Sequence, residues 1–531
     1  MKTRYFIAVL ALLAFVGCDK ENGNEIASVD GENAILKVNL KAAGTITKAT
    51  AENTFQYGSE AENEVSVVDF YFYDAAGEPY SVVSTGTNVI TWNQGTMANV
   101  EKVSNVILVI KKSKKALPTH VVAVVNSEQS YSDLNLTAMS SAVSELKTSK
   151  GFVMSNSVYV GTDGAKVVAT EIQPENIFTT DAKTVEPGAE LNLEGVVPVD
   201  IYVERVASKV AVSPKGLMPV LDEDGVTQMV DAQNRPVFAK VLGWEITNCT
   251  DEAYLLKSVH ASWTSEALGF SPWNNAALCR SYWAATSAVP VHPYSYNDVT
   301  EHVAEADYYY ENTLSAGDGE NTHVSTNGKN QTPQLLVAAK LVTEQEEAVQ
   351  LAKWYNVYYT IGDLKTAMAG KLASKLYVVD SAAEGETAYR SVGVNDLAFE
   401  QTAESATSQR YQVKVVPAAG VTYYTYSGTE VAALTGDALQ ALFADLAPAM
   451  MWNEGATYYY TNISHFGNAT GMVRNHVYDI NLKAVMGFGT PVYNPDHVIV
   501  PERPVEQEAA NLAVKINILS WHVVAQEITL K

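Results

Sequence analysis

The chain has few cysteines and few charged side chains for its length. Only three cysteines stand among 531 residues, too few for a disulfide-stapled scaffold. Cys249 and Cys279 could form a bridge in an exported protein, or both could be buried free thiols. Charged residues make up 18% of the chain, below the roughly 25% of ordinary soluble domains, and hydrophobic residues make up 47%. This composition argues against disorder and is enough to bury large cores.

Positive charge is especially scarce. The chain has 36 lysines and arginines against 60 aspartates and glutamates, which gives a formal net charge of -24. A field of this sign repels the phosphates of nucleic acids and the headgroups of anionic lipids. We therefore expect no nucleic-acid partner.

Sequence motifs of catalysis and metal binding are missing as well. The nine histidines form no HExxH or HxH pair, and no GxSxG, P-loop or GxGxxG segment occurs. Residues 222–225, Asp-Glu-Asp-Gly, lack the spaced ligands and the distal glutamate of a calcium loop, so a solvated turn is the better interpretation. We expect no enzyme, and therefore no catalytic residue, metal site or cofactor.

The N-terminus has the features of an export signal. Lys2 and Arg4 precede an apolar run over residues 5–16, which is too short to span a bilayer. The run ends at Gly17-Cys18, a segment that resembles a bacterial lipobox, in which the cysteine receives acyl chains such as palmitate. Lipidation at Cys18 would anchor the precursor in the outer membrane. The alternative is an ordinary signal peptide with an incidental cysteine.

Isolated strands are predicted near both ends of the chain. Residues 34–41 and 512–518 each alternate apolar and polar side chains with a period of two, as half-buried strands do. Neither has a hairpin partner next to it in the sequence. The first strand is followed by a soft segment of small residues around Lys48, which indicates a protease-accessible loop. The alternation changes phase at Ser520, so residues 523–530 are a second candidate C-terminal strand.

Strand patterns also dominate the body of the chain. Residues 121–125 predict a buried central strand, and the Pro-, Gly- and acid-containing tract 213–235 is the best domain boundary. A Pro-rich connector covers residues 491–504. We expect a signal peptide with lipobox at 1–18, a propeptide with the first strand at 19–48, domains at 49–215 and 216–490, and a connector with C-terminal strand at 491–531.

Tyrosine is unusually frequent, with 29 residues. Tyrosine runs occur at residues 308–310, 358–359, 423–424 and 458–460. In a β-rich protein, consecutive tyrosines usually face the core and solvent in turn. Stacking on sugars is the alternative.

Several stretches, in order along nearly the whole chain, resemble the shaft subunits of Bacteroidota type V fimbriae, specifically the short-fimbria major-subunit family. These stretches are Val68–Asp74, Phe152–Ser155, Val203–Val210, Arg280–Ala284, Val473–Tyr478, Gly487–Val492 and Ile518–Trp521. The resemblance implies a mainly β fold with two β-sandwich-like, transthyretin-like domains, short helices, and exchangeable strands at both ends. It also implies a fimbrium at the cell surface that supports adhesion.

The resemblance further implies how such subunits assemble. A trypsin-like protease cuts the lipoprotein precursor after a lysine or arginine in the loop that follows the first strand, here between Lys48 and Ala49. The C-terminal strand of another copy then replaces the first strand, and accessory subunits form the anchor and the tip. The expected displaced residues are Ile35, Leu36, Val38 and Leu40, and the expected donor residues are Leu512, Val514, Ile516 and Ile518, or those near Val523, Ile528 and Leu530.

A function of a different class stays open at this point. The same features fit an outer-membrane glycan-binding lipoprotein of a polysaccharide-uptake system, which would keep its lipid anchor and stay monomeric. For such a protein, both terminal strands would belong permanently to the sheets of their own domains.

Overall fold

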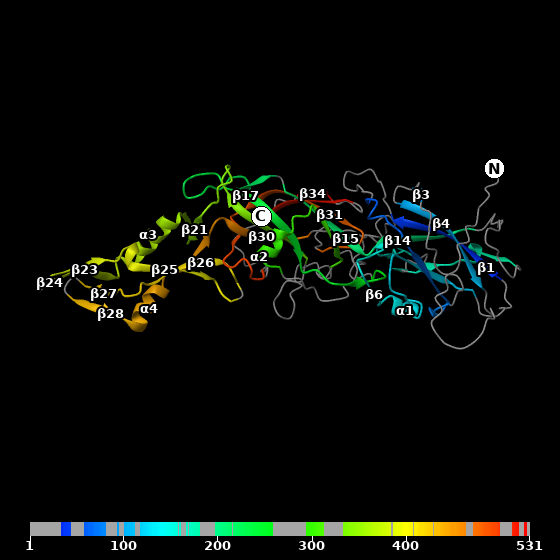
Figure 1. Ribbon diagram of the computed structural model, residues 1–531, viewed down its shortest axis with the longest axis horizontal. Coiled ribbons are helices and arrows are strands. Elements are labelled where there is room, and N and C mark those ends of the chain that lie inside the picture. The colour runs from blue at the N-terminus through cyan, green and yellow to red at the C-terminus, as the bar shows by residue number, and fades with distance from the viewer. Residues whose placement is uncertain are drawn as a thin grey trace.

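Three groups of sheets follow one another along the length of the molecule in the computed structural model (Figure 1). A sheet that contains the first strand lies at one end, a second large sheet lies in the middle, and two smaller sheets with helices lie at the other end. The structure describes residues 33–43, 58–80, 93–94, 100–111, 117–157, 159–160, 166–167, 169–180, 197–214, 216–258, 294–312, 333–383, 386–406, 408–427, 430–463, 471–499, 512–519 and 525–527.

The first sheet has nine strands in the order β12-β5-β9-β14-β1-β4-β3, with β13 paired to β1 and β2 paired to β5. Its strands are β1 (Asn33–Ala43), β2 (Val68–Tyr73), β3 (Asn93–Gln94), β4 (Val100–Lys111), β5 (His120–Val125), β9 (Met154–Asn156), β12 (Thr170–Glu171), β13 (Ile177–Thr180) and β14 (Val199–Arg205). Around it lie α1 (Leu136–Met139), the 3-10 helix η1 (Pro174–Asn176), and the short strands β6 (Val143–Ser144), β7 (Lys147–Thr148), β8 (Gly151–Phe152), β10 (Tyr159–Val160) and β11 (Lys166–Val167).

The first sheet is buried on both faces along β5. Val121, Ala123 and Val125 belong to one apolar cluster, and Val122 and Val124 belong to another on the opposite face. A strand covered on both sides needs a continuous apolar run rather than alternation, which is what the sequence has here. The prediction of a buried central strand at residues 121–125 is confirmed.

The second sheet has ten strands in the order β19-β15-β31-β16-β17-β20-β30-β32, with β33 paired to β31 and β34 paired to β33. Its strands are β15 (Ala207–Pro214), β16 (Leu217–Leu221), β17 (Phe238–Thr247), β19 (Ala306–Tyr310), β20 (Gln334–Val342), β30 (Ala456–Asn462), β31 (Val477–Met486), β32 (Thr490–Pro491), β33 (Leu512–Leu519) and β34 (Ala525–Glu527), with β18 (Ala253–Tyr254) and helix α2 (Tyr296–Glu301) beside them.

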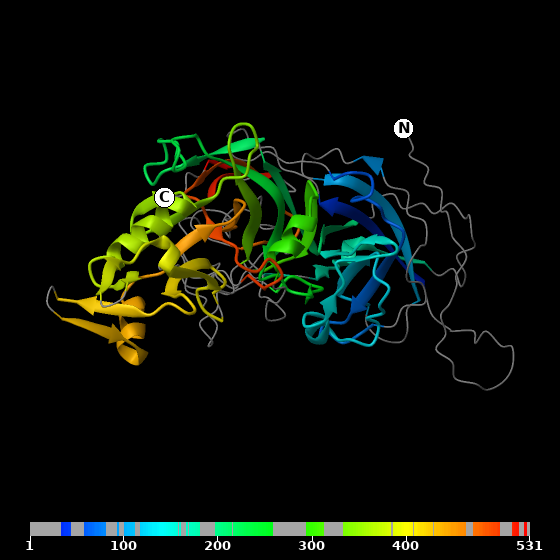
Figure 2. The ribbon, with the colours of Figure 1, turned by 60° about the vertical axis from the view of Figure 1, so that its left-hand side comes forward.

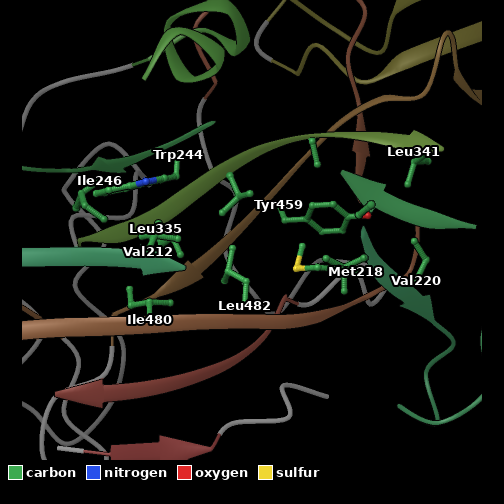
Figure 3. Close-up of a cluster of buried hydrophobic side chains, with 14 of the residues drawn as sticks. Val212, Met218, Val220, Trp244, Ile246, Leu335, Leu341, Tyr459, Ile480 and Leu482 are labelled. Carbon is green, nitrogen blue, oxygen red and sulfur yellow. The ribbon is translucent and has the colours of Figure 1, made fainter. Parts of the chain in front are cut away.

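The core of the second sheet is built from side chains of strands far apart in the sequence (Figure 3). Trp244 from β17, Leu335 from β20, Tyr459 from β30 and Leu482 from β31 are all buried in one apolar cluster. The alternating side chains of these strands place every second residue in the cluster. Burial of such side chains is the main stabilising term for this part of the chain.

A third unit is inserted between β20 and β30, which pair antiparallel with each other from Gln334↔Asn462 to Lys340↔Ala456. It has its own apolar cluster and two sheets, β22-β21-β29-β26-β25 and β24-β23-β27-β28. Its elements are β21 (Leu351–Trp354), β22 (Val357–Tyr359), α3 (Ile361–Leu372), β23 (Tyr377–Ala383), β24 (Glu386–Ser391), the 3-10 helix η6 (Val394–Asp396), β25 (Leu397–Ala403), β26 (Tyr411–Pro417), β27 (Tyr423–Tyr426), β28 (Val431–Leu434), α4 (Gly436–Ala444) and β29 (Ala449–Trp452).

The expected fold class is confirmed: the chain is mainly β, with several sheets and short helices. The chain crosses from the first sheet to the second at Val206, between β14 and β15. The division into two domains at residues 215 and 216 stays a prediction about which parts fold on their own. Among the described residues, no helix is both long enough and apolar enough to cross a membrane.

Gly455 sits where the inserted unit returns to β30, and its backbone needs a glycine. Its φ is +75°, and a Cβ there would lie 2.3 Å from the carbonyl oxygen of Leu341 on β20. We expect Gly455→Ala to lower the free energy of unfolding by about 3 kcal/mol, from backbone strain and a steric clash together. Gly420→Ala is the matched control, because its φ is +78° and nothing lies within 4 Å of the added Cβ. It should cost about 1 kcal/mol. Equal losses in denaturant unfolding would show that the Leu341 contact does not matter.

Candidate functional site

The strand β1 lies in the interior of the first sheet, between β4 and β14. It pairs antiparallel with β4 from Asn33↔Lys111 to Ala43↔Val100, and parallel with β14 from Val38↔Val199 to Ala42↔Val203. Its first residues also pair with β13. The side chains of Leu36 and Val38 are 0% exposed and belong to the apolar cluster of this sheet. The expected first strand is therefore built into a sheet on both of its edges.

The pairing order makes β1 the link that joins the two parts of the first sheet. Among the described strands, β4 pairs only with β1 and with the two-residue strand β3, and β13 pairs only with β1. Without β1, the sheet would separate into β4-β3 on one side and β14-β9-β5 on the other. The backbone groups of Val100–Lys111 and Val199–Val203 would lose their partners, which is costly in an otherwise buried sheet.

The C-terminal strand β33 has a different place in its sheet. It pairs antiparallel along β31, from Val477↔Leu519 to Val485↔Leu512, and among the described strands its other side pairs only with the three residues of β34. β31 also pairs with β15 and β16, so it keeps its place in the sheet through these strands. β33 and β34 therefore lie at an edge of the second sheet, and their removal would leave the rest of that sheet connected. Removal of β1 would divide the first sheet.

The two terminal strands carry the same local pattern. β1 contains Leu36-Lys37-Val38-Asn39-Leu40, and β33 contains Val514-Lys515-Ile516-Asn517-Ile518. In both, three aliphatic residues alternate with a lysine and an asparagine in the same order. The side chains that are buried in β1, Leu36 and Val38, correspond to Val514 and Ile516. A comparison of the strands on the sequence alone would have found this likeness.

Several of the expected site residues fall outside the described parts of the chain. These are Cys18, Lys48, Ala49, Val523, Ile528, Leu530 and Cys279. Ile35 and Leu40 lie in β1, opposite Val109 and Ser104 of β4, and Leu512 and Ile518 lie in β33, opposite Val485 and Tyr478 of β31.

Cys249 is a free, buried thiol whose Sγ lies 3.1 Å from the carbonyl oxygen of Ile246. Burial raises the pKa of this thiol.

A buried polar cluster, which the sequence analysis missed, lies where the chain passes from the first sheet to the second. The guanidinium of Arg474 donates through Nε to Glu311 at 2.9 Å and through Nη1 to the carbonyl oxygen of Leu255 at 3.0 Å. The ammonium of Lys257 lies 3.4 Å from the carboxylate of Glu204, and both side chains are fully buried. Charges without access to water require such partners. The Glu204–Lys257 pair joins β14 of the first sheet to the segment that follows β18, whereas Arg474 and Glu311 lie next to β31 and β19 of the second sheet.

Arg205 and Asn475 continue this cluster. Arg205, the last residue of β14, is buried and donates to Asn475 Oδ1 at 3.1 Å and to the carbonyl oxygen of Glu62 at 2.8 Å. The backbone N–H of Asn475 donates to the carbonyl oxygen of Ala207 at 2.6 Å. Two stretches of the family resemblance, Val203–Val210 and Val473–Tyr478, thus meet at the junction.

Three of the four tyrosine runs alternate between core and surface, as expected for strands, whereas Tyr358 and Tyr359 are both partly buried. Tyr309, Tyr423 and Tyr459 are buried, and their neighbours Tyr308, Tyr310, Tyr424, Tyr458 and Tyr460 are partly exposed. The Oη of the buried Tyr459 donates to the carbonyl oxygen of Gly487 at 3.1 Å. These runs therefore contribute both to the cores and to the surfaces of the sheets.

Within the described ranges, no three histidine, cysteine, aspartate or glutamate side chains group in a way that could hold a metal ion. Buried carboxylates in these ranges instead form ion pairs within the protein, as Glu311 does with Arg474 and Glu204 does with Lys257. The candidate functional site therefore consists of the two terminal strands, β1 and β33, and the strand edges with which they pair.

Comparison with family models finds one match, over residues 450–527, to the model described as "Major fimbrial subunit protein type IV, Fimbrillin, C-terminal". This segment includes β30, β31 and the C-terminal strand β33. The resemblance to fimbrial subunits is confirmed at this level, and the match supports a fimbrial-subunit role. A search of curated proteins finds no match.

Solved structures of fimbrial proteins resemble the chain at low identity. A fimbrilin from Porphyromonas gingivalis W83 is 13% identical over 92% of this chain and 98% of its own, with a TM-score of 0.37. The tip fimbrial protein Mfa3 from Porphyromonas gingivalis is 12% identical over 92% of this chain and 100% of its own, with a TM-score of 0.33. A fimbrial assembly protein from Parabacteroides distasonis is 8% identical over 76% of this chain and 100% of its own, with a TM-score of 0.29.

The carboxyl group of Glu62 links the first sheet to the second, and its pKa makes the link sensitive to acid. Burial opposes its ionisation, but Lys209 Nζ at 2.7 Å, Tyr308 Oη at 2.6 Å and the backbone of Ser59 outweigh burial and lower the pKa from 4.5 to about 2. A carboxyl group whose pKa is lower in the folded state stabilises the fold above its unfolded pKa. This stabilisation is lost as the pH falls from about 4.5 to about 2.

We therefore expect Glu62→Gln to lower the free energy of unfolding by about 2 kcal/mol at pH 7, because it leaves Lys209 without its carboxylate. The variant should also lose less stability than the original chain between pH 5 and pH 3, by urea unfolding at each pH. Glu60→Gln, at an exposed position two residues away, is the control and should behave like the original chain. Parallel pH curves for Glu62→Gln and the original chain would contradict this role.

Proposed function

We propose that the chain is a shaft subunit of a cell-surface fimbria that polymerises by strand exchange and supports adhesion. In this proposal it is exported as a lipoprotein precursor anchored at Cys18, and a protease that cuts after Lys48 frees β1. The C-terminal strand β33 of another copy then occupies the place of β1. The observation that carries the proposal is the contrast in sheet topology: β1 joins two parts of its sheet, and β33 lies at the margin of its own.

The position of Lys48 suits a cut that releases β1. Lys48 lies between the end of β1 at Ala43 and the next described residue, Gly58. After a cut there, β1 would be held to the sheet only by its hydrogen bonds and by the burial of side chains such as Leu36 and Val38. Each such apolar side chain contributes about 1.5–3 kcal/mol. A released strand would leave a gap that only another strand of matching pattern could fill.

The pattern shared by the two strands gives the exchange a defined register. Placed on β1, β33 puts Val514 at the position of Leu36 and Ile516 at the position of Val38. Leu plus Val and Val plus Ile have the same total number of side-chain carbons, so the apolar cluster would keep its volume. A register shifted by one residue would turn Lys515 and Asn517 into the core, which fixes the alignment. This register favours residues 512–519 over residues 523–530 as the donor.

Donor and acceptor on opposite parts of the chain give a head-to-tail contact that does not close on itself. Such contacts produce open filaments. The main-chain hydrogen bonds of an added strand give affinity, and the pockets for alternate side chains give specificity. The family match over residues 450–527 supports a fimbrial subunit at the cell surface, and the partners in this proposal are further copies, anchor and tip subunits, and a Lys- or Arg-directed protease.

Cleavage after Lys48 can be tested with trypsin. Limiting trypsin added to residues 19–531 should give a product that begins at Ala49, with ladders on unboiled gels and filaments by electron microscopy. Lys48→Gln should block this cut and keep the protein monomeric, because trypsin needs a positive side chain before the bond. Lys48→Arg is the matched control and should assemble like the original chain. Assembly of Lys48→Gln at the same rate would exclude Lys48 as the trigger.

The role of β33 as the donor strand can be tested with substitutions in it. After the trypsin cut, Ile516→Asp should prevent ladders, because a carboxylate would replace an aliphatic side chain at the buried position of Val38. The neighbouring change Asn517→Asp is the control and should still assemble, since that position corresponds to Asn39 and alternates to the other face. The cut Ile516→Asp protein should still accept a strand, so adding it to growing filaments should shorten them. Normal ladders from Ile516→Asp would show that β33 is not the donor.

A further inference from the structure

The inserted unit carries a group of tyrosines on one face of the sheet β24-β23-β27-β28. The group, which we call the tyrosine face, consists of Tyr377 on β23, Tyr389 on β24, and Tyr424 and Tyr426 on β27. Paired residues of neighbouring strands share a face, and the pairs Tyr377↔Tyr424, Val379↔Tyr389 and Tyr426↔Val431 bring these side chains together. Tyr426 is 46% exposed and the other three rings are partly exposed.

The rings of the tyrosine face hold one another in place. The centroids of Tyr377 and Tyr426 lie 5.5 Å apart, and those of Tyr389 and Tyr424 lie 5.0 Å apart, both in edge-to-face contact. Since β23 lies between β24 and β27, the Tyr389–Tyr424 contact passes over it. The two pairs therefore cover three strands as one aromatic surface. Rings that are fixed before a ligand arrives lose little conformational entropy on binding.

The other face of the same sheet is covered by the core of the inserted unit. Val378, Val392 and Tyr423 are buried there in one apolar cluster with residues of α3 and α4. The tyrosine face is thus the outer face of the sheet. The views in Figures 1 and 2 place this sheet at the end of the molecule opposite the sheet that contains β1. The tyrosine face belongs to a different sheet from β1 and from β33, so neither exchanged strand is part of it.

The side chains on the tyrosine face are uncharged and rich in hydroxyl groups. By the same pairing, Thr387 and Ser391 on β24 and Val431 and Ala433 on β28 lie on this face. Arg390 pairs with Val378 and therefore lies on the opposite face, where its Nη2 donates to Asp396 at 2.8 Å. Its side chain is 45% exposed there, and its Nε lies 3.3 Å from Asp380 Oδ1. In a chain with a formal net charge of -24, an exposed face without charged side chains fits a neutral ligand.

We propose that the tyrosine face binds a neutral polysaccharide chain. The C–H faces of a sugar ring stack on aromatic rings, and its hydroxyl groups exchange hydrogen bonds with tyrosine, serine and threonine hydroxyls. An outer sheet face suits an extended chain of several sugar units.

The proposed filament would repeat this face once in every subunit. That repetition, which rests on the proposed function, would convert weak single contacts into strong binding through effective concentration. Binding of a glycan by the single chain does not depend on assembly. The test below therefore uses the uncut chain, so that its outcome is separate from the outcome of the trypsin experiments.

The test is affinity electrophoresis of uncut residues 19–531 in native gels that contain xyloglucan, galactomannan, xylan or mixed-linkage β-glucan. We expect at least one of these neutral polysaccharides to retard the chain. The double variant Tyr377→Ala/Tyr424→Ala, which removes one ring from each pair, should lose this affinity by about tenfold or more. Tyr355→Ala is the control, because Tyr355 is an exposed tyrosine of the inserted unit outside the tyrosine face. It should be retarded like the original chain.

Circular dichroism and unfolding midpoints report whether the double variant folds. The single variant Tyr426→Ala, at the most exposed ring of the group, gives a second measurement with little structural cost and should weaken retardation several-fold. Absence of retardation by all four polysaccharides, or equal retardation of the double variant and the original chain, would overturn the proposal. So would self-association of the uncut chain in sedimentation that the double variant abolishes, since the face would then bind a second copy.

Discussion

The hydrogen bonds of β1 hold the first sheet together, because this one strand joins β4 to β14 and also pairs with β13. Its buried side chains, Leu36 and Val38, add an apolar contribution to the same cluster that contains residues of β4, β5 and β14. A strand in this position cannot be removed without a replacement, and a replacement must have the same alternation. The interior place of β1 therefore sets the requirements that any exchanged strand must meet, in length, register and side-chain volume.

The connection between the first and second sheets would be as important in the filament that we propose. Arg474, Glu311, Lys257 and Glu204 are buried at this junction, and each charged group has a partner there. Buried ion pairs add little net stability, but the loss of one partner is costly, so they favour one relative position of the segments that they join. Such a junction would keep the acceptor sheet at one end fixed relative to the sheet that carries the donor strand.

Neither terminal strand belongs to the sheets of the inserted unit. This unit leaves the second sheet at the end of β20, returns at β30, and contains a separate apolar cluster. A unit attached through a hairpin can present an outer surface without disturbing the sheets that assemble. This separation would allow one chain to combine a role in polymerisation with a second surface for ligands, as we propose.

The local features of this protein can be predicted from its amino-acid sequence: the period-two alternation of both terminal strands, the apolar run at residues 121–125, and the alternation of three of the four tyrosine runs. These depend on the geometry of a single strand, in which successive side chains point to opposite faces. Only the tertiary structure decided that β1 is interior and β33 marginal, that Arg474 meets Glu311, and that tyrosines of three strands form one face. Each of these depends on which distant segments pair, and alternation leaves the partner of a strand open because many strands share the same pattern.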